Sequence, residues 1–309
     1  MVAWAVTAAL ALSVAARLLP HDRWWLVSVA NLFTAYLFLP AWPIAMLAAL
    51  GRRWRLLGLA GAIVILHVPG TVMPLLPRQP PSGLAPSIRV VTANLLMEND
   101  SLALLAGELE GFDADVYFLQ ELSARWDDEF ERRGFWLRYP YNRRITGENP
   151  FGCAIASRLP LRDLEVFSMA ELPAVRGRLV LGGREIEIVS LHLMAPIDAE
   201  QGIGHRLGAD RLLQRLKRTR GKSFILAGDF NATSDSFVAT EMREFADDGW
   251  ELAGRGFGAT WPNGVFLAPP IRIDHVYVSR DLTVTRIATG TGAGSDHKPL
   301  VAEIALRRP

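Results

Sequence analysis

Near its C-terminal end the chain reads Gly294-Ser295-Asp296-His297-Lys298-Pro299-Leu300, followed by an apolar run through position 306. Proline disfavours helical backbone at the residue before it, and the apolar run has the pattern of a strand. The sequence therefore predicts that Asp296 and His297 lie on a loop that enters a strand. A carboxylate beside an imidazole can bind a metal, accept a proton or hold a phosphate, although in isolation such a pair is more often a solvated turn.

Five other strand-like runs lead to polar side chains of the same kinds. They cover residues 88–93, 115–120, 185–191, 223–228 and 271–273, and they lead respectively to Asn94, Glu121, His192, Asp229 with Asn231, and Asp274 with His275. Each of these residues alone has a structural explanation, as a turn former, a helix cap or a buried histidine. Six strand-associated sites that share one pattern instead predict a functional site on one rim of a sheet.

The motifs around these residues occur in a recognisable order. They read Thr92-Ala93-Asn94-Leu95, Leu119-Gln120-Glu121, Ser190-Leu191-His192-Leu193, Gly228-Asp229-Phe230-Asn231, Arg272-Ile273-Asp274-His275 and Gly294-Ser295-Asp296-His297-Lys298-Pro299. The series resembles the endonuclease/exonuclease/phosphatase superfamily, which includes pancreatic-type deoxyribonucleases, abasic-site endonucleases, bacterial sphingomyelinases and inositol polyphosphate phosphatases. The resemblance covers residues 88–306, and residues 152–160 resemble an internal strand of the same family.

The resemblance implies an α/β fold, a four-layer sandwich in which two mixed β-sheets pack face to face and helices flank them. The long apolar strands are consistent with burial on both faces. Helices are expected at residues 101–110, 123–133, 199–220 and 236–247. The one cysteine, Cys153, lies within an apolar strand and is expected to be a small buried side chain.

The resemblance also implies a metal site. Glu121, with Asn94 beside it and a contribution from Asp296, is expected to bind Mg²⁺ or Mn²⁺. Hard oxygen ligands of this kind suit a divalent cation that keeps several waters and contacts a substrate phosphate.

By the same resemblance, five residues are expected to carry the catalysis. His297 activates water or contacts the phosphate, and Asp274 holds its imidazole in one tautomer. Asp229 and Asn231 orient the attacking water and a phosphate oxygen, while His192 assists the leaving group or stabilises charge.

Substrate contacts are expected from loops and strands between the motifs. Tyr141 and Arg143 occupy one such region, and Trp261 lies in another. His275 follows Asp274 within a strand-like run, so we interpret it as structural.

The first 77 residues have a different composition. Apolar runs at residues 2–16, 24–50 and 56–76 contain no Asp, Glu, Lys or Arg. Their lengths approach or exceed the roughly 20 residues that span a bilayer. We therefore expect a transmembrane segment of about three helices, with the lipid bilayer as its partner. The first run could instead be a cleaved signal peptide, but it lacks a positively charged start, which favours retention as a helix.

Arginines predict how this segment is oriented. Arg52, Arg53 and Arg55 crowd one short connection, whereas Arg17 and Arg23 flank Asp22 in the other. Positively charged loops tend to remain cytoplasmic. The expectation is a multi-pass protein of the inner or plasma membrane, of a bacterial membrane-anchored type. Residues 78–87 form a Pro-rich linker, and residues 88–309 form an extracytoplasmic catalytic domain.

Charge is divided unevenly along the chain. Residues 1–85 carry six arginines and one aspartate, whereas the remainder carries 27 basic and 31 acidic residues. A net negative domain does not favour tight non-specific binding of a polyanion. The predicted function is a membrane-anchored, divalent-metal-dependent phosphoesterase that cleaves a phosphodiester or phosphomonoester in a nucleic acid or a phospholipid headgroup. The alternative is a catalytically silent membrane scaffold that retains the fold. No protein partner can be inferred.

Overall fold

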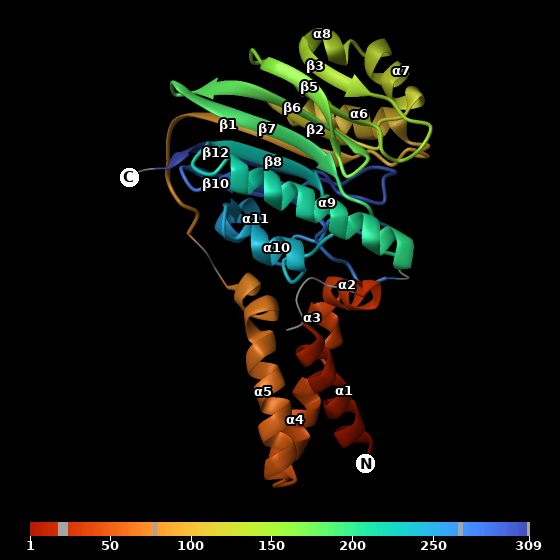
Figure 1. Cartoon of the computed structure of the whole chain (residues 1–309), viewed down its shortest axis with the longest axis vertical. Coiled ribbons are helices and arrows are strands. Elements are labelled where there is room, and N and C mark those ends of the chain that lie inside the picture. Colours follow the sequence, from red (N-terminus) through yellow and green to blue (C-terminus); the bar gives the residue numbers. More distant parts are fainter. Residues whose placement is uncertain (18–23, 77–78, 265–267, 308–309) are drawn as a thin grey trace.

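A computed structural model of the protein describes residues 1–17, 24–76, 79–264 and 268–307. It consists of a helical stalk, built from the N-terminal segment, and a larger α/β domain on one end of that stalk (Figure 1). Two six-stranded sheets form the centre of the domain. The predicted sandwich is confirmed.

The first sheet has the strand order β11-β12-β1-β2-β4-β3. Its strands are β1 (Gly83–Asn94), β2 (Val116–Gln120), β3 (Tyr141–Ile145), β4 (Cys153–Ser157), β11 (Leu282–Thr289) and β12 (Leu300–Arg307). Only β1 and β2 are parallel neighbours; the other pairs are antiparallel. The mixed pairing brings the ends of β1 and β2 to the same edge of the sheet.

The second sheet has the order β5-β6-β7-β8-β10-β9. Its strands are β5 (Arg162–Met169), β6 (Leu172–Leu181), β7 (Arg184–His192), β8 (Phe224–Asp229), β9 (Ala246–Asp248) and β10 (Asp274–Ser279). Here β7 and β8 are the parallel pair. Each sheet therefore delivers two neighbouring strand ends to one edge.

Apolar side chains fill three separate layers. Alternate residues of the strands point to opposite faces, so Val90 packs between the sheets whereas Val91 packs under the outer helices. The outer helices of the first sheet are α6 (Leu102–Gly111), α7 (Ala124–Arg132) and α8 (Phe135–Arg138), and those of the second are α9 (Ala199–Arg218) and α10 (Phe237–Met242). The short helix α11 (Gly249–Ala253) packs against β10 and β11. Cys153 is fully buried between the sheets, as expected.

Two helix starts follow from capping residues in the sequence. The Ser123 side chain accepts a hydrogen bond from the Trp126 N–H, and the Asp198 side chain accepts one from the Gln201 N–H. The expected helix at residues 236–247 is wrong at its end. It stops at Met242, and Ala246–Asp248 pair with β10 instead.

The linker is also shorter than expected, because residues 83–87 already belong to β1 and pair with β12. Residues 77–78, which include its first position, lie outside the described residues.

The stalk consists of α1 (Val2–Arg17), α2 (Trp25–Leu32), α3 (Thr34–Leu37), α4 (Ala41–Leu50) and α5 (Trp54–Thr71), followed by the 3₁₀ turn Met73–Leu75. Only Trp54–Leu75 is by itself long and apolar enough to cross a membrane in the described chain. The second apolar run is not one straight helix, because Trp25–Leu32 and Thr34–Leu50 meet at 75°. The expectation of three helices that each span is therefore not supported, and α1 falls short of that length with 16 residues.

The stalk is bonded directly to the domain. Arg17 forms an ion pair with Asp235 at 2.9 Å, and the Tyr36 hydroxyl donates to the Pro270 carbonyl at 2.6 Å. The Gly256 N–H donates to the Pro74 carbonyl at 3.1 Å. These contacts attach the domain-facing end of the stalk to loops that adjoin the second sheet.

A buried ionic network stabilises those loops. Asp248 accepts a hydrogen bond from Arg272 Nη1 at 2.8 Å and lies 2.9 Å from His275 Nδ1, while His275 Nε2 lies 2.8 Å from the Ala232 carbonyl. His275 is fully buried, and its ring contacts Arg272, Asp248 and the Ala232 carbonyl, which agrees with its structural interpretation. Burial alone would raise the pKa of Asp248, but Arg272 and His275 outweigh it and hold that pKa well below its usual range.

We expect Asp248→Asn to lower the free energy of unfolding by about 3–5 kcal/mol, because it leaves the Arg272 cation buried without its partner. The depressed pKa means that this contribution is present above the unfolded pKa of about 4 and is lost as pH falls through the lower folded value. Thermal unfolding of the full-length protein across pH measures both effects. Asp247→Asn is the matched control, because Asp247 pairs with Arg307 at the surface. Equal losses in the two variants would contradict the prediction.

Candidate active site

The two parallel strand pairs place their ends on one rim of the sandwich. Asn94 is in register with Gln120, the residue before Glu121, and His192 is in register with Asp229. Strand β10 runs antiparallel to β8 and begins at this rim, so Asp274 is in register with Asp229. Strand topology therefore brings together residues as far apart in the sequence as Asn94 and Asp274.

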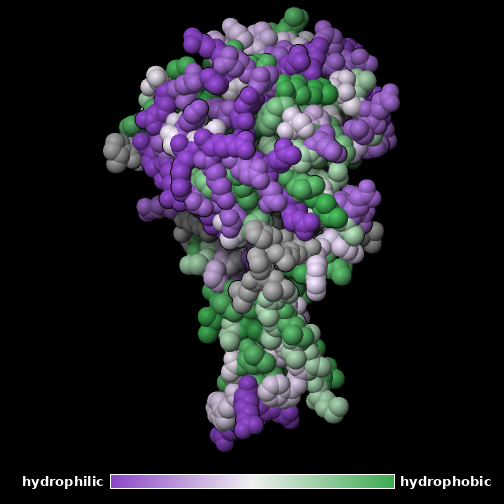
Figure 2. Space-filling view, in the orientation of Figure 1, coloured by the Kyte–Doolittle hydropathy of each residue, from purple (hydrophilic) through white to green (hydrophobic). Residues whose placement is uncertain are grey.

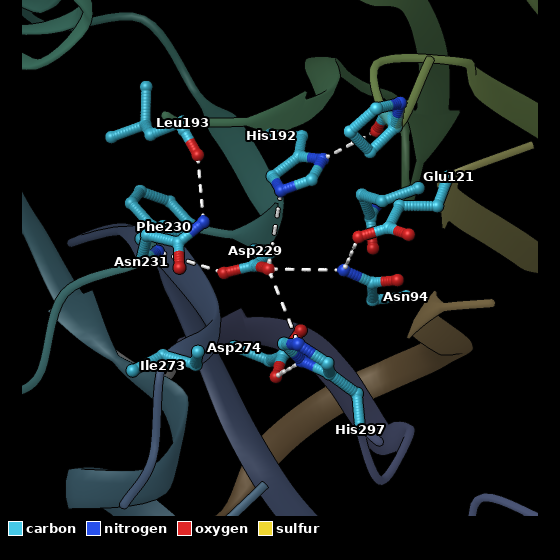
Figure 3. Close-up of polar contacts among 12 residues, drawn as sticks. Asn94, Glu121, His192, Leu193, Asp229, Phe230, Asn231, Ile273, Asp274 and His297 are labelled. Carbon is cyan, nitrogen blue, oxygen red and sulfur yellow. Dashed lines mark hydrogen bonds and ion pairs between the residues drawn. The ribbon is translucent and has the colours of Figure 1, made fainter. Parts of the chain in front are cut away.

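Asp229 lies at the centre of the site (Figure 3). Its Oδ2 atom accepts a hydrogen bond from Asn94 Nδ2 at 3.1 Å and lies 3.4 Å from His192 Nε2 and 3.7 Å from His297 Nε2. The side chain is almost completely buried. One carboxylate oxygen thus connects an amide and two imidazoles from both sheets.

The backbone after Asp229 turns sharply around the other carboxylate oxygen. Asp229 Oδ1 accepts the Asn231 N–H at 2.8 Å, and Asn231 has a φ of 47°, a left-handed conformation that asparagine tolerates. Gly228 lies so close to β7 that a Cβ atom would be 1.9 Å from the Leu191 carbonyl oxygen. These constraints account for the Gly-Asp-Phe-Asn motif. The Asn231 side chain donates to the Leu193 carbonyl at 2.8 Å, which fixes its amide at the edge of the site.

His297 is held by a second carboxylate. Its Nδ1 atom lies 2.8 Å from Asp274 Oδ2, and both side chains are buried. The Ser295 hydroxyl accepts the His297 N–H at 3.0 Å and donates to the Asn94 carbonyl at 2.9 Å. The serine of the C-terminal motif therefore attaches the histidine loop to β1.

Glu121 also has a left-handed backbone, with a φ of 57°. Its Oε1 atom accepts Asn94 Nδ2 at 2.9 Å, and its Oε2 atom accepts the Met97 N–H at 3.1 Å. The Asn94 amide group thus bridges Glu121 and Asp229, while its Oδ1 atom accepts the Leu96 N–H at 3.1 Å. In this arrangement Asn94 positions the carboxylates through its nitrogen.

The donor set fits a divalent cation. Four carboxylates gather at the rim, and two buried oxygens, Asp274 Oδ1 and Asp296 Oδ1, have no hydrogen-bond partner in the described part of the chain. A cation would compensate this negative charge, and oxygen ligands suit Mg²⁺ or Mn²⁺.

Asp229, Asp274 and His297 also have potential ligand atoms within 4.8 Å of one another. We interpret this trio as proton-handling groups, because the Nδ1 atom of His297 is already within hydrogen-bond distance of Asp274.

Burial and neighbouring charges shift the pKa values of Asp229 and His297. Burial and the neighbouring Asp274 charge raise the pKa of Asp229. Burial alone would lower the pKa of His297, but the Asp274 and Asp229 carboxylates reverse this effect and raise it to about 10. Without a bound cation, His297 is therefore an imidazolium at neutral pH, and Asp229 accepts a proton more readily than an exposed aspartate.

The expected substrate contacts lie at different distances from this centre. Trp261 Nε1 donates to Asp296 Oδ2 at 3.1 Å, so Trp261 borders the site. Arg143 and Tyr141 lie on the edge strand β3. Tyr141 pairs with Ser157 at one end of β4, whereas Cys153, at the other end of β4, pairs with Gln120 near the rim. The structure does not bring Tyr141 to the site, and Arg143 lies two positions from the rim.

Two supporting features were not predicted. The Thr260 hydroxyl accepts the N–H groups of Ile273 and Asp274, each at 3.2 Å, and the Thr260 carbonyl accepts the Lys298 N–H at 2.8 Å. Thr260 thereby connects the loops of Asp274 and His297. The Pro150 carbonyl lies 3.1 Å from His192 Nδ1, which orients that ring. A lone threonine and a backbone carbonyl leave no recognisable motif, although Thr260 precedes the tryptophan that the sequence does highlight.

Comparison with protein families matches residues 91–297 to the endonuclease/exonuclease/phosphatase family. Comparison with curated proteins gives no significant match.

Solved structures share the fold. Zebrafish (D. rerio) TDP2, solved with a single-strand DNA product, is 18% identical, covers 71% of this chain and 98% of its own, and has a TM-score of 0.60. An endonuclease/exonuclease/phosphatase from Beutenbergia cavernae is 18% identical over 72% of both chains, with a TM-score of 0.58. A protein of unknown function from Enterococcus faecalis is 20% identical over 71% of this chain and 100% of its own, with a TM-score of 0.57. At these identities the likeness is one of fold.

The position of His297 between two carboxylates predicts its titration. In the presence of chelator, we expect its ring to remain protonated through neutral pH and to titrate near 10. Its raised pKa contributes stability that is fully present below about pH 6.5 and is lost as pH rises through the folded value. Nitrogen-detected NMR of the imidazoles measures this, and Asp274→Asn should move the titration toward the ordinary range. Asp296→Asn should move the titration less, because Asp296 raises the pKa of His297 less than Asp274 does. A His297 that titrates near 6.5 in all three proteins would refute the prediction.

Proposed function

Because the chain belongs to the endonuclease/exonuclease/phosphatase family, we propose that it is a membrane-anchored phosphoesterase that uses Mg²⁺ or Mn²⁺. Members of this superfamily are generally hydrolases that act on phosphoesters. The observation that carries the proposal is the buried Asp229 carboxylate, which lies within reach of Asn94 and two imidazoles. Such a cluster concentrates proton donors and acceptors on one rim, where a phosphoryl group can enter.

The cation would be held by Glu121 and Asp296, with Asn94 keeping Glu121 in place. When bound, it neutralises phosphoryl charge and polarises the reacting phosphorus. The protein's own part is to supply oxygen ligands that are held in position, as the Asn94 side chain and the Met97 N–H hold Glu121.

The remaining residues account for the proton movements of hydrolysis. Asp229, whose pKa is raised, accepts a proton from the water that attacks phosphorus, and Asn231 orients that water. His297, protonated beside Asp274, donates hydrogen bonds to the phosphoryl oxygens as charge develops on them. As the bond to the leaving oxygen breaks, His192 supplies a proton to that oxygen. The products are an alcohol and a phosphate with one ester bond fewer.

A catalytically silent scaffold is the alternative. A scaffold would not need Glu121, Asp229, Asn231, Asp274 and His297 together. It would also gain nothing from burying two carboxylates near each other, which is energetically costly. The intact set therefore favours an enzyme.

The membrane anchor is supported by the surface of the stalk. Most of the large apolar side chains that are exposed in the described chain belong to residues 1–76. Figure 2 shows this apolar surface along the stalk, with hydrophilic residues at its free end. Arg52, Arg53 and Arg55 lie in or beside the α4–α5 connection, opposite the domain. We propose that this end is cytoplasmic and that the domain lies on the other side.

We expect Glu121→Gln to abolish most hydrolysis without unfolding the domain, because it removes a charge and almost no volume. The full-length protein would be tested on DNA, RNA, phospholipids, inositol phosphates and simple phosphomonoesters, with chelator and after addition of Mg²⁺ or Mn²⁺. Metal should restore the wild type and not the variant. Glu185→Gln, an exposed site at the far end of β7, is the control and should retain activity. Metal-independent hydrolysis would refute the metal assignment, and inactivity on every substrate would favour the scaffold.

Orientation has its own test. Alkaline phosphatase fused to the C-terminal end should be active and a fluorescent protein there should be dark, because both report an extracytoplasmic position. The same reporters fused within the Arg52–Arg55 connection should give the opposite result. The reverse pattern at the two positions would overturn the proposed orientation.

A further inference from the structure

Large apolar side chains are exposed where the domain meets the stalk. Ile203 and Leu207 on α9 are each 50% exposed, and Ile197 in the preceding loop is 66% exposed. On α2, Trp24 at its start is 69% exposed and Leu26 is 61% exposed. In Figure 2, hydrophobic residues lie among hydrophilic ones on the front of the domain, in the region where Figure 1 shows α9. We call these five side chains the α2–α9 surface.

These side chains are not required for packing of the domain. The inner face of α9 uses other positions, which include Ala209, Leu212 and Leu216, to cover the second sheet. Ile203 and Leu207 are four residues apart and share the outer face, so they form an apolar stripe on a helix whose remaining outer residues are polar. A contiguous exposed apolar patch indicates an interaction surface.

Helices α2 and α9 are in close contact. A Cβ atom at Gly202 would lie 2.7 Å from the Cβ atom of Trp25, so the glycine permits the close approach. Beside this contact lies a cavity of about 400 Å³ lined by residues of both helices, among them Trp24 and Arg206. The apolar side chains of α2 and of α9 therefore belong to one surface, although they are separated by more than 170 positions in the sequence.

The position of the α2–α9 surface along the stalk indicates what this surface contacts. Helix α5 has 18 residues and is about 27 Å long, close to the thickness of a bilayer's hydrocarbon core of about 30 Å. The Pro74 carbonyl just beyond it already accepts the Gly256 N–H, and Arg17 at the end of α1 already pairs with Asp235. These two contacts place the domain directly at the end of α5 and α1. Side chains exposed at this level therefore lie in the headgroup layer.

The bend in the stalk supports the same placement. Helix α2 meets the following helical segment at 75°, so it runs across the stalk rather than along it (Figure 1). Tryptophans are favoured in the interfacial layer of a bilayer, and a helix lying in that layer buries its apolar side chains by about 5–10 Å.

We propose that the α2–α9 surface inserts into the lipid headgroup layer and that the substrate of the active site is a phosphoester carried by a membrane lipid. The proposal rests on the phosphoesterase function above. Ile197 lies in the short connection that follows His192. The Leu193 carbonyl in that connection accepts a hydrogen bond from the Asn231 side chain. Insertion of this surface therefore holds the rim that carries His192 and Asn231 beside lipid headgroups.

Charge favours a lipid over a nucleic acid as the substrate carrier. Residues 86–309 carry 27 basic and 31 acidic side chains, and Asp198 and Glu200 lie next to the surface together with Arg206 and Arg211. A mixed charge of this kind does not attract a polyanion, whereas apolar insertion binds a lipid surface without net positive charge.

Fluorescence quenching tests the surface directly. Full-length Ile203→Cys protein, labelled with nitrobenzoxadiazole and reconstituted in phosphatidylcholine–phosphatidylglycerol vesicles, should be quenched several-fold more by nitroxide-bearing lipids than labelled Leu137→Cys. Leu137 is 84% exposed on α8, at the end of the domain remote from the stalk. The native Cys153 should not react, because burial raises the pKa of its thiol to about 12. Equal quenching at both positions, with the stalk resistant to alkaline extraction from the vesicles, would overturn the proposed surface.

Catalysis tests the substrate class. The double variant Ile203→Glu and Leu207→Glu should lose about tenfold or more in the rate on a vesicle-borne lipid phosphoester, because charged side chains oppose insertion, and should hydrolyse soluble bis(4-nitrophenyl) phosphate at the wild-type rate. Leu137→Glu should change neither rate, and thermal unfolding verifies that each variant is folded. Hydrolysis of nucleic acid but of no lipid, or equal rates for all proteins on vesicles, would overturn the lipid assignment. If the wild type hydrolyses no phosphoester, the proposed function fails, while quenching still decides whether the surface contacts lipid.

Discussion

Burial of the Asp229 carboxylate is the constraint on which the site depends. A carboxylate removed from water must be hydrogen-bonded or paired, and here the partners come from β1, β7 and the loop before β12. Those elements belong to both sheets, so the contacts that satisfy Asp229 also fix how the sheets meet at this rim. The fold and the site are therefore stabilised by the same set of side chains, and loss of one partner affects both.

The strands of the domain are largely predictable from the sequence, because buried strands are apolar and end at polar residues. The order of the strands is not encoded in any local pattern. What the family resemblance implied was the sandwich of two mixed sheets. The error at residues 236–247 has a clear cause: Ala246–Asp248 have no strong strand pattern and are extended because they pair with β10, a strand about thirty residues later. The bend in the second apolar run likewise depends on distant contacts, such as the one between the Thr233 hydroxyl and the Asn31 carbonyl.

The site shows the same division between local and distant information. The motif residues around Asp229 lie together as expected, because strand ends with polar residues converge when two strands of each sheet are parallel. Thr260 escaped prediction because its role depends on two loops that only the folded chain brings together. The placement of Tyr141 also depends on distant information. Its position in the sequence resembles that of a substrate contact, but the register of the edge strand β3 carries it to the far end of the sheet.

The stalk contacts the segments that carry side chains of the candidate site. Thr233 and Asp235 follow Asn231 in the loop after β8, and Pro270 lies four residues before Asp274. Three of the bonds that attach the stalk therefore reach the backbone or side chains of these two loops, and the Asp248–Arg272 ion pair supports them from inside the domain. Because the stalk and the active site use the same loops, the position of the rim relative to the stalk is restricted to the arrangement that these bonds allow. A stalk joined only through a flexible tether would leave the rim free to face any direction, whereas these bonds fix the orientation of the rim relative to the stalk.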